Sequence, residues 1–107
     1  MGKLPKRYEK FLETYPRVGE AYKELSSAIG ESGPLDPKQC ALIKLGISIG
    51  ARQEGGARSQ ARKALEAGAS ADEIRHAVMQ ATTTVGFPTM MAGLSWVEGV
   101  LLEPKDD

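Results

Sequence analysis

The chain has 107 residues, of which 41% are hydrophobic and 26% charged, and its fourteen basic residues balance its fourteen acidic ones. This composition is typical of one folded domain with a modest core and excludes a disordered chain. A formal net charge of zero gives no electrostatic reason to expect nucleic acid or an anionic membrane as a partner. It also leaves little charge repulsion to oppose self-association.

Two further classes of protein are disfavoured. The longest apolar run, ALIKLGISIGA, contains Lys44 and ends before Arg52, so it is shorter than the roughly 20 apolar residues of a membrane helix. The N-terminal residues MGKLPKRYEKF are basic but lack the apolar stretch of a secretory signal, and a cytoplasmic protein is therefore expected. Cys40 is the single cysteine, which excludes a disulfide or a dithiol relay within one chain.

The pattern of helix breakers and apolar spacing predicts about six helices and no strand, and thus an all-α fold. A first short helix is expected over about 6–14, ended by Pro16. A second is expected from 16 or 17 to about 29. Its spacing places several apolar residues on one face, namely Val18, Ala21, Tyr22, Leu25 and Ile29.

The third helix has a clear start, because Asp36 is a good N-cap and Pro37 suits the first helical position. Residues 42–49 are apolar nearly all round the helix, which predicts a central, buried element. Gly46 and Gly50 lie one turn apart and would allow a neighbouring helix to approach closely.

The fourth helix is expected over about 57–67, after a turn at the two glycines 55 and 56, with Gly68 just beyond its end. Ser70 and Glu73 form a capping-box pattern that opens a fifth helix. The core face of that helix is predicted to be Ile74, Ala77, Val78, Ala81 and Val85.

A Gly-Phe-Pro break at 86–88 separates the fifth helix from a last helix over about 89–102. On that last helix Met90, Met91, Trp96 and Val97 are expected to pack in the core or against another subunit.

One long stretch carries a family pattern. Residues 35–88 contain LDPK, the ALIKL core, ARKALEAGAS-x-x-EI and the GFP break, in that order. In order and spacing these segments resemble the core of the carboxymuconolactone decarboxylase and AhpD-like (alkylhydroperoxidase D-like) superfamily. The resemblance implies a single helical domain of that kind over residues 1–107. It also implies a homo-oligomer, either a trimer or a hexamer built from dimers, with pockets at subunit contacts.

The residues that perform the family's thiol chemistry are missing. Thiol-bearing members typically show Glu, then after eleven residues Cys-x-x-Cys, then three residues and His. In this chain those places hold Ala41, Gln53, Gly56 and Gln60. Thiol–disulfide exchange needs a thiolate and a resolving thiol, so peroxidase activity by that route is excluded. No metal or cofactor is expected.

The decarboxylase members also lack the cysteine pair. They resemble the ARKAL segment of this chain, but they have a His at the place of Gln60. A His there could move a proton, whereas Gln cannot. Gln60 could still orient a substrate carboxylate or carbonyl by hydrogen bonding. The alternative is that Gln60 simply bonds backbone or water.

One polar line crosses the third helix, formed by Lys44, Ser48 and Arg52 at i, i+4 and i+8. These residues lie within about a turn of Ala41 and Gln53, so they could line the same cavity and hold a small carboxylate ligand. The alternative is an exposed stripe whose long side chains reach into water.

Two other reactive side chains have ordinary explanations. His76, the single histidine, lies off the apolar face and is expected to be a solvated surface residue rather than a catalytic base. Cys40 is expected to act as a small core hydrophobe, although the helix N-terminus and Lys44 leave a reactive role open.

Two functions of different classes therefore remain. The chemistry favours a catalytically degenerate member of the family that acts as an oligomeric ligand-binding or structural protein. The alternative is a non-redox decarboxylase or lactone-handling enzyme that acts on a small organic acid, so enzyme activity stays an open question. Expected partners are further copies of the chain and a small carboxylate, without nucleic acid or membrane.

Overall fold

The computed structural model describes residues 5–103, and this part of the chain is all-α, as predicted. None of its helices is long and apolar enough to cross a membrane. The elements in chain order are α1 (Lys6–Thr14), α2 (Pro16–Gly30), α3 (Pro37–Gly50), α4 (Glu54–Glu66), α5 (Ala71–Met79), a short 3-10 turn η1 (Gln80–Thr83), and α6 (Phe87–Leu101).

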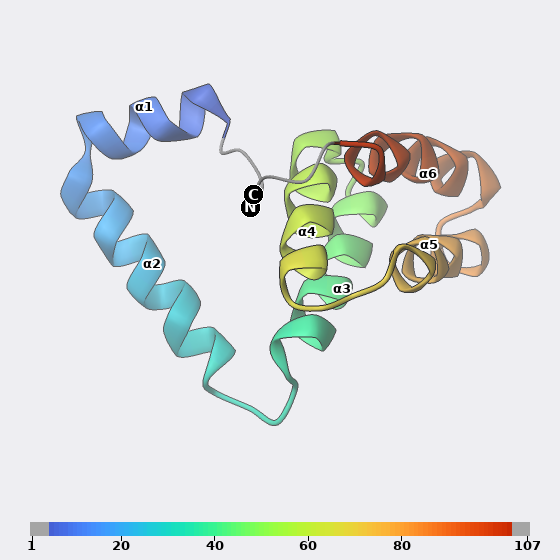
Figure 1. Ribbon diagram of the computed structural model, residues 1–107, viewed down its shortest axis with the longest axis horizontal. Coiled ribbons are helices and arrows are strands. Elements are labelled where there is room, and N and C mark those ends of the chain that lie inside the picture. The colour runs from blue at the N-terminus through green and yellow to red at the C-terminus, as the bar shows by residue number, and fades with distance from the viewer. Residues whose placement is uncertain (1–4, 104–107) are drawn as a thin grey trace.

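The first two helices form an arm that stands apart from a bundle made of α3 to α6 (Figure 1). α2 buries a single residue, Gly19, which lies against the side chain of Leu12 in α1. The radius of gyration is 14.3 Å, whereas about 13 Å is expected for a compact chain of this length. The arm therefore adds little to the core of the single chain.

Two capping boxes begin the bundle's central helices. At α3 the Asp36 side chain accepts from the Gln39 backbone N–H at 2.7 Å, and the Gln39 side chain accepts in return from the Asp36 N–H at 3.0 Å. At α5 the Ser70 side chain accepts from the Glu73 N–H at 3.0 Å, and the Glu73 side chain accepts from the Ser70 N–H at 2.9 Å. The Asp36 cap and the Ser70 box are confirmed; the part played by Gln39 is an addition from the structure.

The predicted start of the fourth helix was wrong. α4 begins at Glu54, so both glycines at 55 and 56 are helical, and the turn lies before them. It is made at Arg52, which has a left-handed φ of 56°. The Gln53 N–H donates to the Ser48 carbonyl at 2.8 Å, and the Gln53 carbonyl accepts from Ala57 at 2.8 Å. These two bonds close α3 and open α4 without a glycine turn.

The fifth helix is shorter than predicted. α5 ends at Met79, and the backbone N–H groups of Val85 and Gly86 both donate to the Ala81 carbonyl, at 2.8 and 3.0 Å. With the helix ended in this way, Val85 lies outside the predicted core face, and 49% of that residue is exposed. α6 accordingly begins at Phe87 rather than Thr89, because a proline is tolerated in the first helical turn.

The core depends on one helix face made of alanine. Ala57, Ala61 and Ala64 of α4 are fully buried. Because they are small, α4 lies close to both α3 and α6, with which it makes extensive contact. The large side chains that fill the remaining space come from the other bundle helices, namely Leu45, Ile49, Ile74, Val78 and Val97.

The expectation that α3 is buried all round was wrong for the single chain. Its inner face is buried, with Leu45 and Ile49 fully covered. Its outer face is not, since Ile43 is 47% and Ile47 65% exposed. The other three bundle helices cover one side of α3 only, because the arm that precedes it extends away instead of packing on it (Figure 1).

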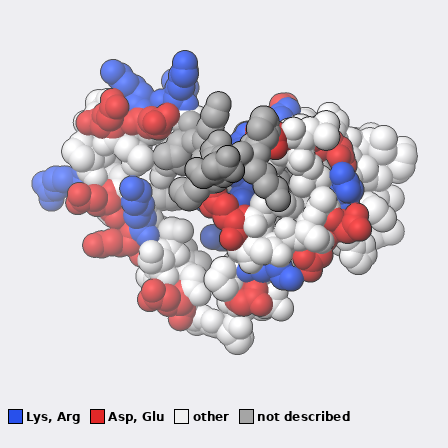
Figure 2. Space-filling view, viewed as in Figure 1, with Lys and Arg blue, Asp and Glu red and all other residues white. Residues whose placement is uncertain are grey.

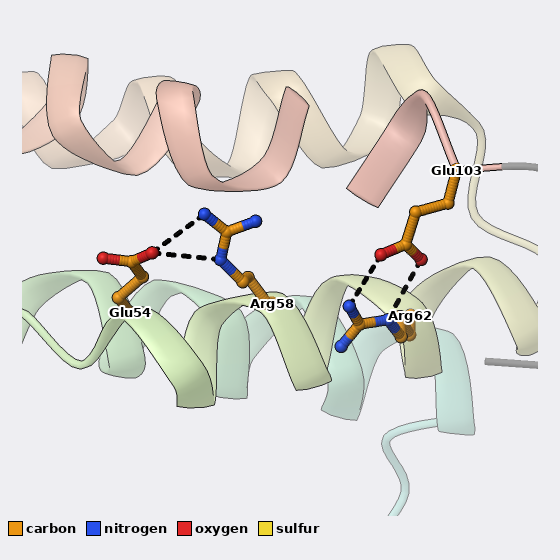
Figure 3. Close-up of polar contacts among 4 residues, drawn as sticks. All are labelled: Glu54, Arg58, Arg62 and Glu103. Atoms are coloured by element: carbon orange, nitrogen blue, oxygen red, sulfur yellow. Dashed lines mark hydrogen bonds and ion pairs between the residues drawn. The ribbon is translucent and has the colours of Figure 1, made fainter. Parts of the chain in front are cut away.

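Several ion pairs lie on the outer surface of the bundle. In Figure 3, Arg58 donates twice to Glu54 within α4, and Arg62 forms a two-pronged pair with Glu103 at the end of α6. Arg75 of α5 forms a similar pair with Glu98 of α6, at 2.6 and 3.0 Å.

The Arg75–Glu98 pair predicts a pH dependence of stability. The hydrogen bond from Arg75 lowers the pKa of Glu98 below its usual value of 4.5. A depressed folded-state pKa contributes stability that is present above the unfolded pKa and is lost as the pH falls through the folded one. Glu98→Gln should therefore unfold more easily than the parent at pH 7, and this difference should vanish well below pH 4, where Glu98 is protonated.

Urea denaturation at several pH values measures this difference. Glu20→Gln, on the exposed arm, is the matched control and should show no such convergence. A Glu98→Gln deficit that persists unchanged at pH 2 would assign the effect to packing instead of charge.

Candidate functional site

The candidate site lies where α3 meets α4, at the four places that the family resemblance marks. Ala41 is buried on the inner face of α3, 7% exposed. Gln53 is the N-cap residue of α4, and Gly56 and Gln60 follow on that helix one turn apart. The places of the two family cysteines are thus the N-cap and third residue of α4, positions whose side chains can reach each other across the first turn.

The two helices approach closely at Gly56. A Cβ atom added there would lie 3.2 Å from the Ser48 Oγ of α3 and 3.5 Å from the Gln53 side chain. Ser48 is half-buried, and its carbonyl holds the Gln53 N–H. A side chain at the place of the family's second thiol would therefore lie in tight contact with α3.

Gln60 carries an unsatisfied polar atom. Its amide oxygen is buried and accepts no hydrogen bond from the described residues. A buried amide oxygen ordinarily has a donor, supplied by the protein, by water or by a ligand. In this helical hairpin Ser48 of α3 lies opposite Gly56 of α4. Gln60 follows Gly56 by one turn and Lys44 precedes Ser48 by one turn, so Gln60 and Lys44 are expected at about the same level.

The structure separates the members of the predicted polar line. Ser48 lies beside Gly56, but Arg52 turns away and donates through Nη1 to the Thr89 hydroxyl at the start of α6, at 2.8 Å. Lys44 is exposed and forms no hydrogen bond or ion pair with the described residues. Lys44 and Arg52 are therefore not gathered into one charged pocket around Gln60.

His76 and Cys40 lie away from these four places. His76 is exposed on α5, where its carbonyl accepts a long hydrogen bond of 3.4 Å from Gln80. Cys40 is half-buried near the start of α3, and its thiol faces the Leu35 carbonyl at 3.7 Å. Within residues 5–103, no three His, Cys, Asp or Glu side chains are placed to hold a metal ion.

Sequence reasoning missed a groove on the other side of α3. Its cavity has a volume of about 300 Å³, and none of the four family places, nor Lys44, Ser48 or Arg52, lines it. The all-round apolar pattern of α3 was the available signal, but it was attributed to burial in the core. The groove lies between α3 and the α5–η1 segment, and its walls include Ile43, Gly46, Ile47, Gly50, Ala81 and Val85.

Comparison with known proteins agrees with this fold. The profile of the Carboxymuconolactone decarboxylase family matches residues 16–99. Among solved structures, the apo form of lpg0406, a carboxymuconolactone decarboxylase family protein from Legionella pneumophila, superposes with a TM-score of 0.76 at 20% sequence identity, covering 89% of this chain and 85% of that one. A search of curated proteins finds no match.

The chain therefore belongs to the carboxymuconolactone decarboxylase family, within the superfamily that includes the AhpD-like proteins. The family match spans α2 to most of α6, so it includes the arm helix α2 as well as the bundle. The likeness to the Legionella protein concerns the fold, and it assigns no ligand to this chain.

The site geometry predicts that a dithiol can be installed. In a Cys40→Ser background, Gln53→Cys/Gly56→Cys should form an intrachain disulfide in a glutathione redox buffer, because the N-cap and third positions share one side of the first turn. The helix N-terminus should also favour the thiolate at position 53. Counting free thiols before and after oxidation measures the bridge.

Gln53→Cys alone is the control and should keep its thiol free of an intrachain bridge. Adding Ser48→Ala relieves the contact at Gly56 and should ease bridge formation. Two free thiols in the double variant after oxidation, with and without Ser48→Ala, would show that this junction does not place the two positions together.

Proposed function

We propose that this protein is a non-catalytic, self-associating member of the carboxymuconolactone decarboxylase family that acts as a structural or ligand-binding oligomer. The observation that carries the proposal is the composition of the site. Ala41, Gln53, Gly56 and Gln60 stand where the thiol-bearing members have Glu, Cys, Cys and His, and none of these side chains can attack a substrate or exchange a proton near neutral pH.

The surroundings supply no replacement chemistry. The histidine and the cysteine lie elsewhere, Arg52 is engaged with Thr89, and no general base among the described residues bonds the Ser48 hydroxyl. An activated serine or cysteine needs such a base within hydrogen-bond reach. The close packing at Gly56 further supports a scaffold role, because it leaves little space beside Ser48.

Self-association is supported by exposed apolar surface. Large hydrophobic side chains are about 40–65% exposed along the arm, on the outer face of α3 and around the 3-10 turn, among them Tyr22, Leu25, Ile43 and Val85. Monomeric proteins seldom leave contiguous apolar patches of this kind uncovered. Acidic and basic side chains are interspersed in Figure 2, with no large patch of one sign on that face, which favours apolar contacts between copies over a charged partner.

Two measurements on the purified protein test this proposal. Sedimentation velocity at tens of micromolar should show an assembly larger than one chain. Assays with an organic hydroperoxide and a dithiol, and with a carboxylated lactone, should show no turnover above buffer. A monomer throughout the concentration range, or turnover that Gln60→Ala abolishes, would overturn it.

A second candidate, binding or conversion of a small organic acid, is favoured by the orphaned amide oxygen of Gln60. A protonated carboxyl group or a bound water could donate to that oxygen, and Lys44 at the same level could face the acid's charge. Arg52 could join only by leaving Thr89.

Replacing Gln60 distinguishes an empty site from an occupied one. If the oxygen has no donor, Gln60→Leu should raise the free energy of unfolding by about 1 kcal/mol or more, because a buried unsatisfied acceptor is removed. If water or a ligand donates to it, the change should be neutral or destabilising. Gln53→Leu, at an exposed position, is the control and should stay within about 0.5 kcal/mol of the parent.

Repeating the denaturation with 10 mM succinate checks the acid directly. A stabilisation of the parent that is absent in Lys44→Ala and Gln60→Leu would support the second candidate. Equal behaviour of all three proteins with and without succinate would remove it.

A further inference from the structure

The arm carries a continuous apolar stripe that nothing in the chain covers. Four residues of α2 recur at i, i+4, i+7 and i+11, and they are 55–60% exposed: Val18, Tyr22, Leu25 and Ile29. This spacing is the pattern of a helix that lays one face into a groove. The residues that flank the stripe are small (Ala21, Ser26 and Ala28), and the charged residues lie round the back (Arg17, Glu20, Lys23 and Glu24).

The groove beside α3 is the complementary surface. Ile43 and Ile47 form one wall and Val85 stands on the other, each about half exposed or more. Between them Gly46 faces open space, since a Cβ atom added there would meet no atom within 4 Å. A helix can therefore approach the backbone of α3 closely at this point.

The polar atoms of the two surfaces also match. Gln80 and Thr84 are the polar residues of the groove. The Gln80 side chain donates through Nε2 to a backbone carbonyl, which leaves its amide oxygen as an acceptor. The Tyr22 hydroxyl needs such a partner once it is buried. No charged side chain lines the groove, so an uncharged helix face is the occupant that suits it.

We propose that α2 of one copy lies in the α3/α5–η1 groove of a second copy, and that the second copy's α2 lies in the groove of the first. This inference rests on the self-association proposed above and names the surfaces that produce it. It explains why α3 is apolar all round although its own bundle covers one side only. It also explains why the family match includes α2, which contributes almost nothing to its own core.

The buried surface area favours a reciprocal pair of contacts over a single contact. A fully covered aromatic side chain buries about 150–250 Å² and an aliphatic one somewhat less, so the half-exposed residues contribute roughly 100 Å² each. The stripe and the groove walls together then give on the order of 700 Å² per contact. A stable interface buries about 1,200–2,000 Å², which two reciprocal contacts reach and one does not.

Disulfide trapping between differently labelled chains tests the docking. In a Cys40→Ser background, a Leu25→Cys chain is mixed with an Ile47→Cys chain that carries a mass tag, and the mixture is oxidised with copper phenanthroline. The expected product is a covalent dimer with one chain of each kind. Glu24→Cys, on the back of α2, replaces Leu25→Cys in the control and should link poorly.

Other arrangements of α2 would give other crosslinked products. A Leu25→Cys homodimer as the main species would show α2 packed on α2 and would overturn the proposal. An intrachain bridge in a chain that carries both cysteines would show that α2 folds onto its own groove, and it would overturn the proposal as well.

Sedimentation separates this inference from the proposed function. Leu25→Glu and Ile47→Glu should each weaken association at least tenfold, whereas Glu24→Gln should leave it unchanged. Circular dichroism should show the helical content of the parent, because neither side chain belongs to the buried core. If both charged variants associate like the parent, the docking is wrong and self-association stands. If the parent itself is a monomer, both are wrong.

Discussion

The close approach of α4 to its neighbours is the constraint on which the rest of the structure depends. The three buried alanines of α4 add little hydrophobic area themselves, yet their small size lets α3 and α6 come near enough for larger side chains to interlock. α6 also approaches α3 closely, since a Cβ atom added at Gly93 of α6 would lie 3.0 Å from the Ile49 side chain. The bundle is therefore small and closely packed.

The small size of the bundle limits how many apolar side chains it can bury. Four helices around an alanine face enclose few large residues, so much of the apolar content remains on the surface. α3 shows this most clearly, with an inner face in the core and an equally apolar outer face in solvent. Small folds often gain the missing burial through oligomerisation. The extended arm and the open groove of this chain are the surfaces through which such burial can occur.

The same close packing affects the positions where the thiol-bearing members of the family have their reactive residues. A side chain at position 56 would lie 3.2 Å from the Ser48 hydroxyl, so a thiol there requires a small shift of that hydroxyl. The Arg52 side chain binds Thr89 and so joins the α3–α4 turn to α6, although it could in principle have faced a ligand. What persists of a polar site is the buried oxygen of Gln60, whose satisfaction by water, ligand or nothing distinguishes the two functional candidates.

The sequence by itself determined the secondary structure and the family, because helix caps, proline positions and apolar spacing are local properties. Asp36 with Pro37, and Ser70 with Glu73, are local signals that begin helices, and Gln53 and Gly56 exclude the Cys-x-x-Cys route whatever the fold. The predicted helix boundaries failed at the helical glycines of α4 and at Val85. At both places an N–H group, of Gln53 or of Gly86, donates to a carbonyl five residues back and ends the helix, and the spacing of breakers did not reveal this.

Only the tertiary structure decided which apolar faces are covered. Periodicity shows that α2 and α3 have apolar faces, but burial depends on whether another element lies against them, which is a property of the whole arrangement. The same holds for the polar line on α3: its spacing is visible in the sequence, but the separation of Arg52 from Ser48 follows from a left-handed turn and a hydrogen bond to a residue 37 positions away.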